Sequence, residues 1–345
     1  MKEPGRQPRR ICGGVFGAAA WKGTEKSMEK QSKTGFRTTI GGQALIEGIL
    51  MRGPEKQAIV VRSPEGLVVK EEKLKLIRDR YPILGLPIIR GSVTFLDSMV
   101  KGVKALMFSA DYYPEEEVTE PSRFEKWLDE KLGNETIEKL VIGFSVVLAV
   151  CFSLLLFMLI PTTVASLVPY FTDSEVVRNL VDAVLRVVMF LGYLILVSRQ
   201  KDIKRVFAYH GAEHKTIFCY EKGLELTVEN VRPQPKHHPR CGTSFLFVVI
   251  IVSILFHSVI FAIWPVESLP ARIGIQLLLL PLVVGITYEF NRYVGGHDNP
   301  VTNVLARPGM WMQNFTTNEP DDSMIEVAIA AMKLVIPEEK GKDRW

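Results

Sequence analysis

Four long stretches of the chain are predominantly apolar: residues 140–160, 176–198, 245–264 and 273–288. Charged residues in the second stretch, Arg178, Asp182 and Arg186, lie toward its start. The first stretch carries no charged residue, and its length is close to the roughly 20 residues that an α-helix needs to cross the hydrocarbon of a bilayer. The third is interrupted only by His257. The pattern predicts a polytopic membrane protein, mainly α-helical, with four transmembrane helices.

Shorter periodic segments flank these runs. The β-branched runs 58–62 and 67–70, joined by Ser-Pro-Glu-Gly, predict a β-hairpin. Over 87–110, apolar residues recur every three or four positions with charges on another face. This predicts an amphipathic helix that lies in the headgroup layer or packs across the bundle. A short loop is expected after residues 307–317, within which Trp311 and Phe315 suit a membrane interface or a lid over the site. A similar apolar stripe then predicts a helix over 321–336.

Basic residues predict the orientation of the four spans. Nine Lys and Arg residues lie in 199–242, whereas the connection 161–177 has none. Because short basic loops stay in the cytoplasm, we expect a multi-pass protein of the cell membrane with both termini cytoplasmic. The lipid bilayer is then its first expected partner.

The expected organisation follows the chain from end to end. A disordered basic tail covers 1–37. A small cytoplasmic α+β region, with the hairpin and the amphipathic helix, covers 38–135. The four-span membrane domain covers 136–336; it includes a cytoplasmic histidine-rich segment, 199–245, and the C-terminal helix. A second tail covers 337–345.

The overall charge of the chain excludes few classes of binding partner. The chain has 42 basic and 38 acidic residues, a formal net charge of +4. Its basic residues cluster beside the apolar runs, where anionic headgroups account for them, so we expect no nucleic-acid partner. The four cysteines show no C-x-x-C spacing, and we expect them to be free in a reducing cytoplasm.

Four of the six histidines lie between the second and third apolar runs: His210, His214, His237 and His238. The first two belong to an H-x-x-E-H sequence, the order found in inverted zinc hydrolases. Residues four apart share a helix face, so both imidazoles can bind one ion while Glu213 reaches its water. The motif predicts a Zn²⁺ site on a helix with Glu213 as the catalytic base.

The third metal ligand stays open at this point. Glu289, near the cytoplasmic end of the fourth run, is preferred because a carboxylate on a firm helix completes a set of two histidines and one acid. The rival ligands are His237, His238, Cys241 and His297. Asp298 is a candidate to orient a histidine from outside the ligand set.

Two polar features inside the apolar runs are expected to be structural. Asp182 and Arg186 are four residues apart, so they can form an ion pair near the far surface. His257 falls about 18 Å beyond the cytoplasmic mouth of its run at 1.5 Å per residue. We expect it to be a hydrogen-bonded histidine inside the membrane.

Several motifs together resemble a known family. The sequences GGQALIEGILMRGP, YHGAEHKTI, HPRCGTSF and PGMWMQNFTT resemble the YqhQ-type family of bacterial membrane proteins, over about residues 38–336. That group is commonly described as predicted metal-dependent enzymes. The resemblance implies a metal role for His210, Glu213 and His214 and names no substrate.

Two functions from different classes fit this sequence. The first is a metal-dependent membrane hydrolase with a cytoplasmic site that acts on peptide or lipid-linked bonds. The second is a non-catalytic accessory protein of membrane assembly or protein translocation. In that case the histidines form a structural polar network, and another membrane protein is the partner.

Overall fold

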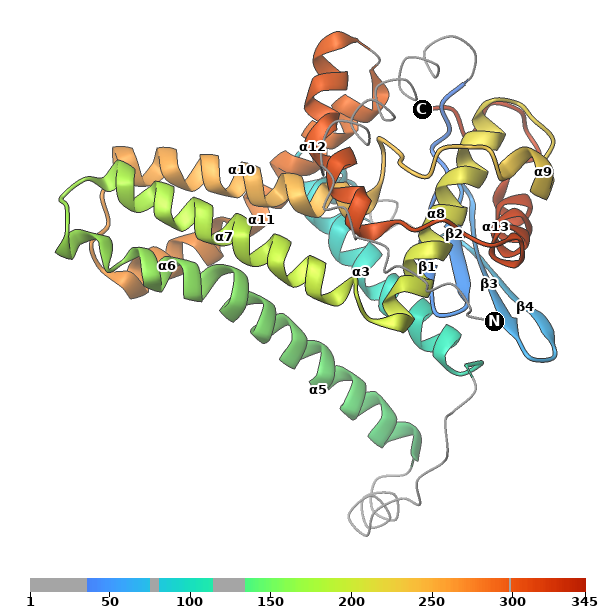
Figure 1. The fold of residues 1–345 in the computed structure, drawn as a ribbon, viewed down its shortest axis with the longest axis horizontal. Coiled ribbons are helices and arrows are strands. Elements are labelled where there is room, and N and C mark those ends of the chain that lie inside the picture. Colours follow the sequence, from blue (N-terminus) through green and yellow to red (C-terminus); the bar gives the residue numbers. More distant parts are fainter. Residues whose placement is uncertain (1–35, 75–80, 114–133, 298) are drawn as a thin grey trace, which may run out of the picture.

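The computed structural model describes residues 36–74, 81–113, 134–297 and 299–345. Helices dominate this part of the chain, and four strands form one small sheet (Figure 1). The tail expected over 1–37 falls almost entirely outside the described residues, and so does Asp298.

The sheet is an antiparallel meander of order β1-β2-β3-β4. Its strands are β1 (Gly41–Leu45), β2 (Gly48–Arg52), β3 (Lys56–Ser63) and β4 (Gly66–Lys73). The predicted hairpin is confirmed as β3–β4, closed at the pair Ser63–Gly66. The hairpin β1–β2 was not predicted; it turns at Glu47, whose φ is 48°.

Both faces of this sheet are covered by helices that are distant in sequence. Side chains alternate along a strand, so Ile49 and Val60 face one way and Leu50 and Val61 face the other. The first pair packs with residues of α8 (Lys201–Glu221) and α13 (Asp322–Val335). The second pair packs around Ala105 of α3 (Ile89–Ala110). The N-terminal strands thus share a core with the middle and the end of the chain.

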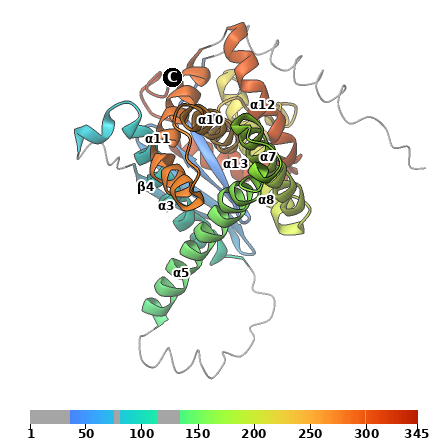
Figure 2. The ribbon, with the colours of Figure 1, turned by 90° about the vertical axis from the view of Figure 1, so that its left-hand side faces the viewer.

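Four helices in the described ranges are long and apolar enough to cross a membrane, as the hydropathy pattern predicted. They are Leu140–Tyr170, Glu175–Val197, Gly242–Ile263 and Leu269–Gly296. The first consists of α5 (Asn134–Leu154), a π-helical turn (Leu155–Leu159), α6 (Ile160–Ala165) and a short turn (Val168–Tyr170). The others are α7, α10 and α11. Figures 1 and 2 show α5 diverging from the other three.

The predicted amphipathic helix is confirmed as α3, and it packs across α11. Gly285 permits this contact, because a Cβ there would lie 2.3 Å from the Ile88 carbonyl oxygen. Arg90 donates two hydrogen bonds to the Glu289 carboxylate, at 2.7 and 2.5 Å. The short turn Pro82–Gly85 precedes α3.

Residues 307–316, for which no helix was predicted, belong to helix α12 (Pro300–Thr316). The short loop expected after this segment is present and leads to the next helix. A capping box starts α12: Asn299 accepts from the Thr302 backbone, and Thr302 accepts in return. Pro300 at the first helical position adds to this start. Pro308 lies inside the helix without ending it. The predicted C-terminal helix is confirmed as α13, capped by Asp321.

The last residues of the chain lie against the first described ones. The Thr38 hydroxyl donates to the buried Asp343 carboxylate at 2.7 Å, and the Trp345 backbone donates to the Arg37 carbonyl. Both ends of the described chain therefore lie on the same side of the molecule as the sheet.

Candidate metal centre

Helix α8 carries the H-x-x-E-H motif through the core of the molecule. The helix begins after Gln200 and passes into Gly223, which has a φ of 67° and suits a helix end. Asp202 lies in its first turn, where an acidic side chain favours the helix start. Every residue from Ala208 to Cys219 is buried, because α13 and the sheet enclose the helix. The two histidines are therefore fixed by packing on several sides.

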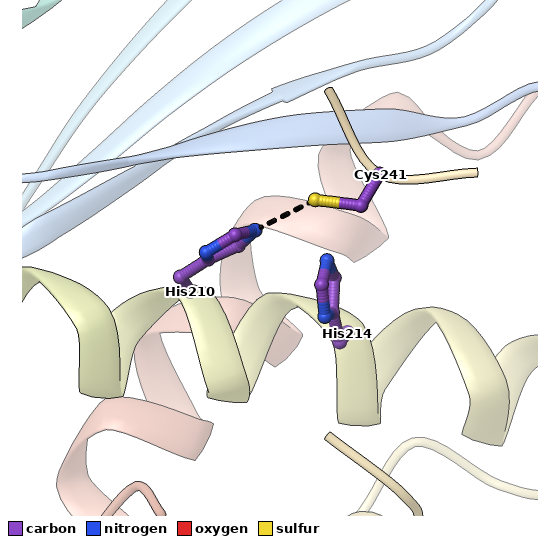
Figure 3. Close-up of side chains that lie close together, drawn as sticks. All are labelled: His210, His214 and Cys241. Carbon is purple, nitrogen blue, oxygen red and sulfur yellow. Dashed lines mark hydrogen bonds between the residues drawn. The ribbon is translucent and has the colours of Figure 1, made fainter. Parts of the chain in front are cut away.

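Three potential metal ligands meet at the middle of this helix (Figure 3). The ligand atoms of His210, His214 and Cys241 all lie within 4.8 Å of one another. Among them, His210 Nε2 lies 3.1 Å from Cys241 Sγ. The side chains of His210 and His214 are only 7% and 1% exposed. The structure thus brings together the two motif histidines and one of the rival third ligands.

Backbone carbonyls fix the orientation of both imidazoles. His210 Nδ1 lies 2.8 Å from the Thr316 oxygen, and His214 Nδ1 lies 2.6 Å from the Lys236 oxygen. Since a carbonyl only accepts, each Nδ1 carries the proton. Nε2 is then the nitrogen that each ring presents toward Cys241. Carbonyl partners of this kind orient histidines in known metal sites.

Cys241 reaches the centre from the start of α10 (Gly242–Ile263), where it is the N-cap residue. Burial raises the pKa of its thiol, but the adjacent imidazoles of His210 and His214 outweigh burial and hold it well below the usual value. Burial lowers the pKa of His210, whereas the Cys241 thiolate and Glu213 raise it, to about 9 overall. Without an ion, the pair is therefore a thiolate beside an imidazolium.

Glu213 lies beside the three ligands without joining them. It is 4% exposed, burial raises its pKa, and the Gly42 backbone N–H donates to it. Among the described residues, its Oε2 has no hydrogen-bond partner, and neither have the buried Nε2 atoms of His214 and His237. Buried polar groups are normally paired, so the unpaired Nε2 of His214 and Oε2 of Glu213 beside the Cys241 thiolate fit an ion and its water.

The donor set is also chemically suited to a metal. Two neutral imidazoles and one thiolate match the nitrogen and sulfur ligands of Zn²⁺, and three protein ligands leave one position open. The sulfur disfavours Mg²⁺ and Ca²⁺, which prefer oxygen. The residues present therefore fit a Zn²⁺-type ion.

His238, another rival ligand, belongs to a neighbouring network. The Gln313 side chain accepts from the His238 backbone N–H and donates to its carbonyl, both at 2.7 Å. The His238 ring lies near Arg240 and Glu221, which form a close ion pair. His238 therefore supports the loop that carries Cys241. His237 lies close by but outside the three-ligand group.

The structure places the preferred third ligand, Glu289, elsewhere. Its carboxylate accepts from the Arg90 side chain and from the Ile88 backbone N–H. His297 is also outside the ligand group: its Nδ1 lies 2.8 Å from the Tyr293 carbonyl, and its ring stacks on Tyr293. The predicted topology places Glu289 and His297 at the same depth in the membrane as the histidines of the H-x-x-E-H motif. Equal depth does not determine whether side chains from different helices lie next to one another.

Three supporting residues were not recognised in the sequence as parts of the centre. Thr316 and Lys236 contribute only their carbonyls, so no side-chain pattern could reveal them. Gln313 and Thr316 do fall in the PGMWMQNFTT motif, and this motif was the feature of the sequence that could have pointed to them. Gly211 has a different role: a Cβ there would lie 2.1 Å from the Asn318 oxygen, so this glycine permits close packing of α8 on the segment after α12.

Comparisons with known proteins agree with the resemblance found in the motifs. The family model described as "Protein of unknown function (DUF1385)" matches residues 86–338. The chain is 34% identical over 311 residues to the uncharacterized protein YqhQ of Bacillus subtilis (strain 168), a match that covers 86% of this chain and 92% of that protein. No solved structure matches the chain. The chain therefore belongs to the YqhQ-type DUF1385 family.

Proposed function

We propose that this protein is a membrane-bound, metal-dependent hydrolase whose ion is Zn²⁺, held by His210, His214 and Cys241. The observation that carries the proposal is the convergence of two Nε2 atoms and one thiolate, with both Nδ1 atoms engaged by carbonyls. A site selected only for helix packing has no need of unpaired nitrogen atoms at its centre. Cys241 takes the place for which Glu289 was first preferred.

Each residue has a distinct role in the proposed reaction. When bound, Zn²⁺ acidifies water and polarises a carbonyl or phosphoryl oxygen. Glu213 accepts a proton from water at Oε2 and then donates it to the leaving group, a role that suits a carboxyl whose pKa is raised by burial. Thr316 and Lys236 keep the imidazoles in the required tautomer.

The proposal includes a cytoplasmic site in a multi-pass protein of the cell membrane. Four apolar helices support the spans, and the basic residues of 199–242 support the inward side of α8. The contact of Trp345 with Arg37 supports both termini on one side. Substrates at the inner membrane surface, with peptide or lipid-linked bonds, have access to such a site.

The test is hydrolysis in ¹⁸O-labelled water. Zinc-loaded protein in liposomes is incubated with lipid and peptide extracts of bacterial membranes, and products that gained ¹⁸O are identified by mass spectrometry. We expect labelled products with wild-type protein and at least about a hundredfold fewer with Glu213→Gln, at unchanged metal content. Label that is equal in the two samples contradicts the role of Glu213.

The alternative to an enzyme is a non-catalytic accessory protein of membrane assembly or protein translocation. Under that function, Glu213→Gln supports growth as well as the wild type does, and the protein co-purifies with a stoichiometric membrane-protein partner. Neither result is expected for the hydrolase.

The short distance from His210 Nε2 to Cys241 Sγ favours one further candidate, a cysteine nucleophile. Two ligands of one tetrahedral Zn²⁺, at about 2.1 and 2.3 Å from the ion, lie roughly 3.5 Å apart, whereas this pair is 3.1 Å apart. A thiolate with an adjacent imidazole is also the pattern of an activated cysteine. Alkylation of Cys241, located by peptide mapping, separates the two: bound Zn²⁺ protects a ligand, whereas a nucleophile reacts equally with and without added Zn²⁺.

A further inference from the structure

A second group of polar side chains lies inside the bundle of apolar helices. Arg178, Arg186 and Arg272 are 4%, 7% and 2% exposed. Arg186 pairs with Asp182 at 3.0 Å, as the sequence predicted, whereas Glu175 is shared by Arg178 and Arg272 at 3.2 and 3.3 Å. Three cations thus face two anions. Charges inside a membrane are costly, and they commonly mark a functional site.

A cavity of about 170 Å³ borders this group. Arg186, Gln276 and His257 form its polar end. Within the part of the chain that the structure describes, Gln276 Nε2 and His257 Nε2 have no hydrogen-bond partner, although these residues are only 2% and 4% exposed. His257 is therefore only half satisfied: Ser253 engages its Nδ1 at 3.1 Å, and the other nitrogen is left for a ligand.

Apart from Ser153 and Ser253, the rest of the cavity wall is apolar. Leu154, Phe157, Met158, Val249, Ile250 and Leu280 form it. Part of this wall is the π-helical turn Leu155–Leu159, an irregularity that occurs often at functional sites. Ser153, also at the wall, is exposed on α5, so the cavity reaches the outer surface of the helices.

The cavity is separate from the metal centre. His257 follows Cys241 by sixteen residues on α10, which corresponds to about 24 Å along a helix. The two sites therefore lie toward opposite ends of the bundle, and a ligand at one does not touch the other.

We propose that this cavity binds an anionic amphiphile, a carboxylate or phosphate head that carries an acyl chain. The head accepts hydrogen bonds from Gln276 Nε2 and, with the Nε2–H tautomer, from His257. Its charge balances the excess cation among the three arginines. The chain lies along the apolar wall and leaves past α5. Water alone fits less well, because most of the wall offers no hydrogen bond and a hydrated site retains the charge imbalance.

The experiment measures ligand binding to the purified full-length protein in detergent micelles. Three probes are compared: tritiated palmitate, tritiated dioleoylphosphatidylglycerol and inorganic phosphate. The head contacts are removed by Gln276→Leu and His257→Leu, both close to the original volume. The chain site is filled by Ile250→Phe, and its matched control on the same helix is Leu255→Phe, because Leu255 is 62% exposed.

We expect saturable binding of palmitate or phosphatidylglycerol at about one molecule per chain. Each head variant should weaken it roughly tenfold, as expected for the loss of a hydrogen bond to a charged group. Ile250→Phe should abolish binding, and Leu255→Phe should leave it unchanged. The probe that binds tells a fatty acid from a phospholipid.

Three results overturn the proposal. They are no saturable binding of either lipid, equal binding by wild type and Ile250→Phe, and binding of inorganic phosphate as tight as that of the lipids. Elution volume and melting temperature confirm that each variant is folded. Ile250→Phe and Leu255→Phe make the same kind of change on one helix. A general loss of stability therefore does not explain a loss of lipid binding in Ile250→Phe alone.

Discussion

His210 Nε2 lies 3.1 Å from Cys241 Sγ, although the residues are 31 positions apart and belong to different helices. The contact joins α8, which is buried against the sheet, to the first turn of α10, a candidate span. The Cys241 thiolate therefore lies directly at the start of one of the four apolar helices. His214 completes the centre one helical turn away.

The tight contact at Gly211 predicts a specific sensitivity of this centre. In Gly211→Ala, the new Cβ must displace the Asn318 carbonyl, which follows Thr316 by two residues. We expect the free energy of unfolding to fall by about 2 kcal/mol or more and metal affinity to fall with it. Thermal unfolding and metal titration measure the two effects.

Gly192→Ala is the matched control for that substitution. Gly192 also lies within a helix, but a Cβ there meets nothing within 4 Å. Because alanine has a higher helix propensity than glycine, the melting temperature of Gly192→Ala should equal or exceed that of the wild type. Equal stability of the two variants would show that the 211–318 contact is dispensable.

Glu289 is predicted to stabilise the contact of α3 with α11 without binding metal. Its ion pair with Arg90 is partly exposed, with side chains 26% and 23% accessible. We expect Glu289→Gln to cost about 1 kcal/mol of unfolding free energy and to retain full metal content. A loss of metal in this variant would return Glu289 to the ligand set.

Acid is predicted to weaken the loop that carries Cys241. Burial and the nearby Arg240 lower the pKa of His238 to about 4, whereas an unfolded histidine titrates near 6.5. Between these values the unfolded chain binds more protons than the folded one, so stability falls as pH falls from about 6.5 to 4. The full difference corresponds to about 3 kcal/mol.

The measurement compares melting temperatures at pH 7.5 and pH 5 for metal-free wild type and His238→Gln. Glutamine does not titrate, so the variant should lose less stability on acidification, whatever its stability at pH 7.5. The same acid loss in both proteins would mean that other groups, and not His238, control this response.

Much of the architecture follows from local patterns in the sequence. The four apolar helices, the β3–β4 hairpin, α3 and α13 were predicted because hydropathy and side-chain periodicity are local signals. The histidine helix was predicted because positions 210 and 214 must share one face. Even Asp182 and Arg186 pair as their spacing requires.

What could not be predicted depends on contacts between distant segments. Whether Glu289 or Cys241 is the third ligand depends on which side chain lies next to the two histidines in the plane of the bundle. Hydropathy carries no information on that position. Helix α12 was missed because Pro308 and Gly309 resemble a break, whereas the cap at Asn299 and tertiary packing sustain the helix. The ordered end of the chain depends on the pairing of Thr38 with Asp343, residues 305 positions apart.

The most direct test of the metal centre is the metal content of the purified protein. Inductively coupled plasma mass spectrometry is applied to wild type, His210→Ala, His214→Ala and Cys241→Ser, with Glu289→Gln as the control. We predict about one zinc ion per chain in wild type and control, and less than about a tenth of that in each ligand variant. Equal zinc in all five proteins, or none in the wild type after growth with zinc, would contradict the account.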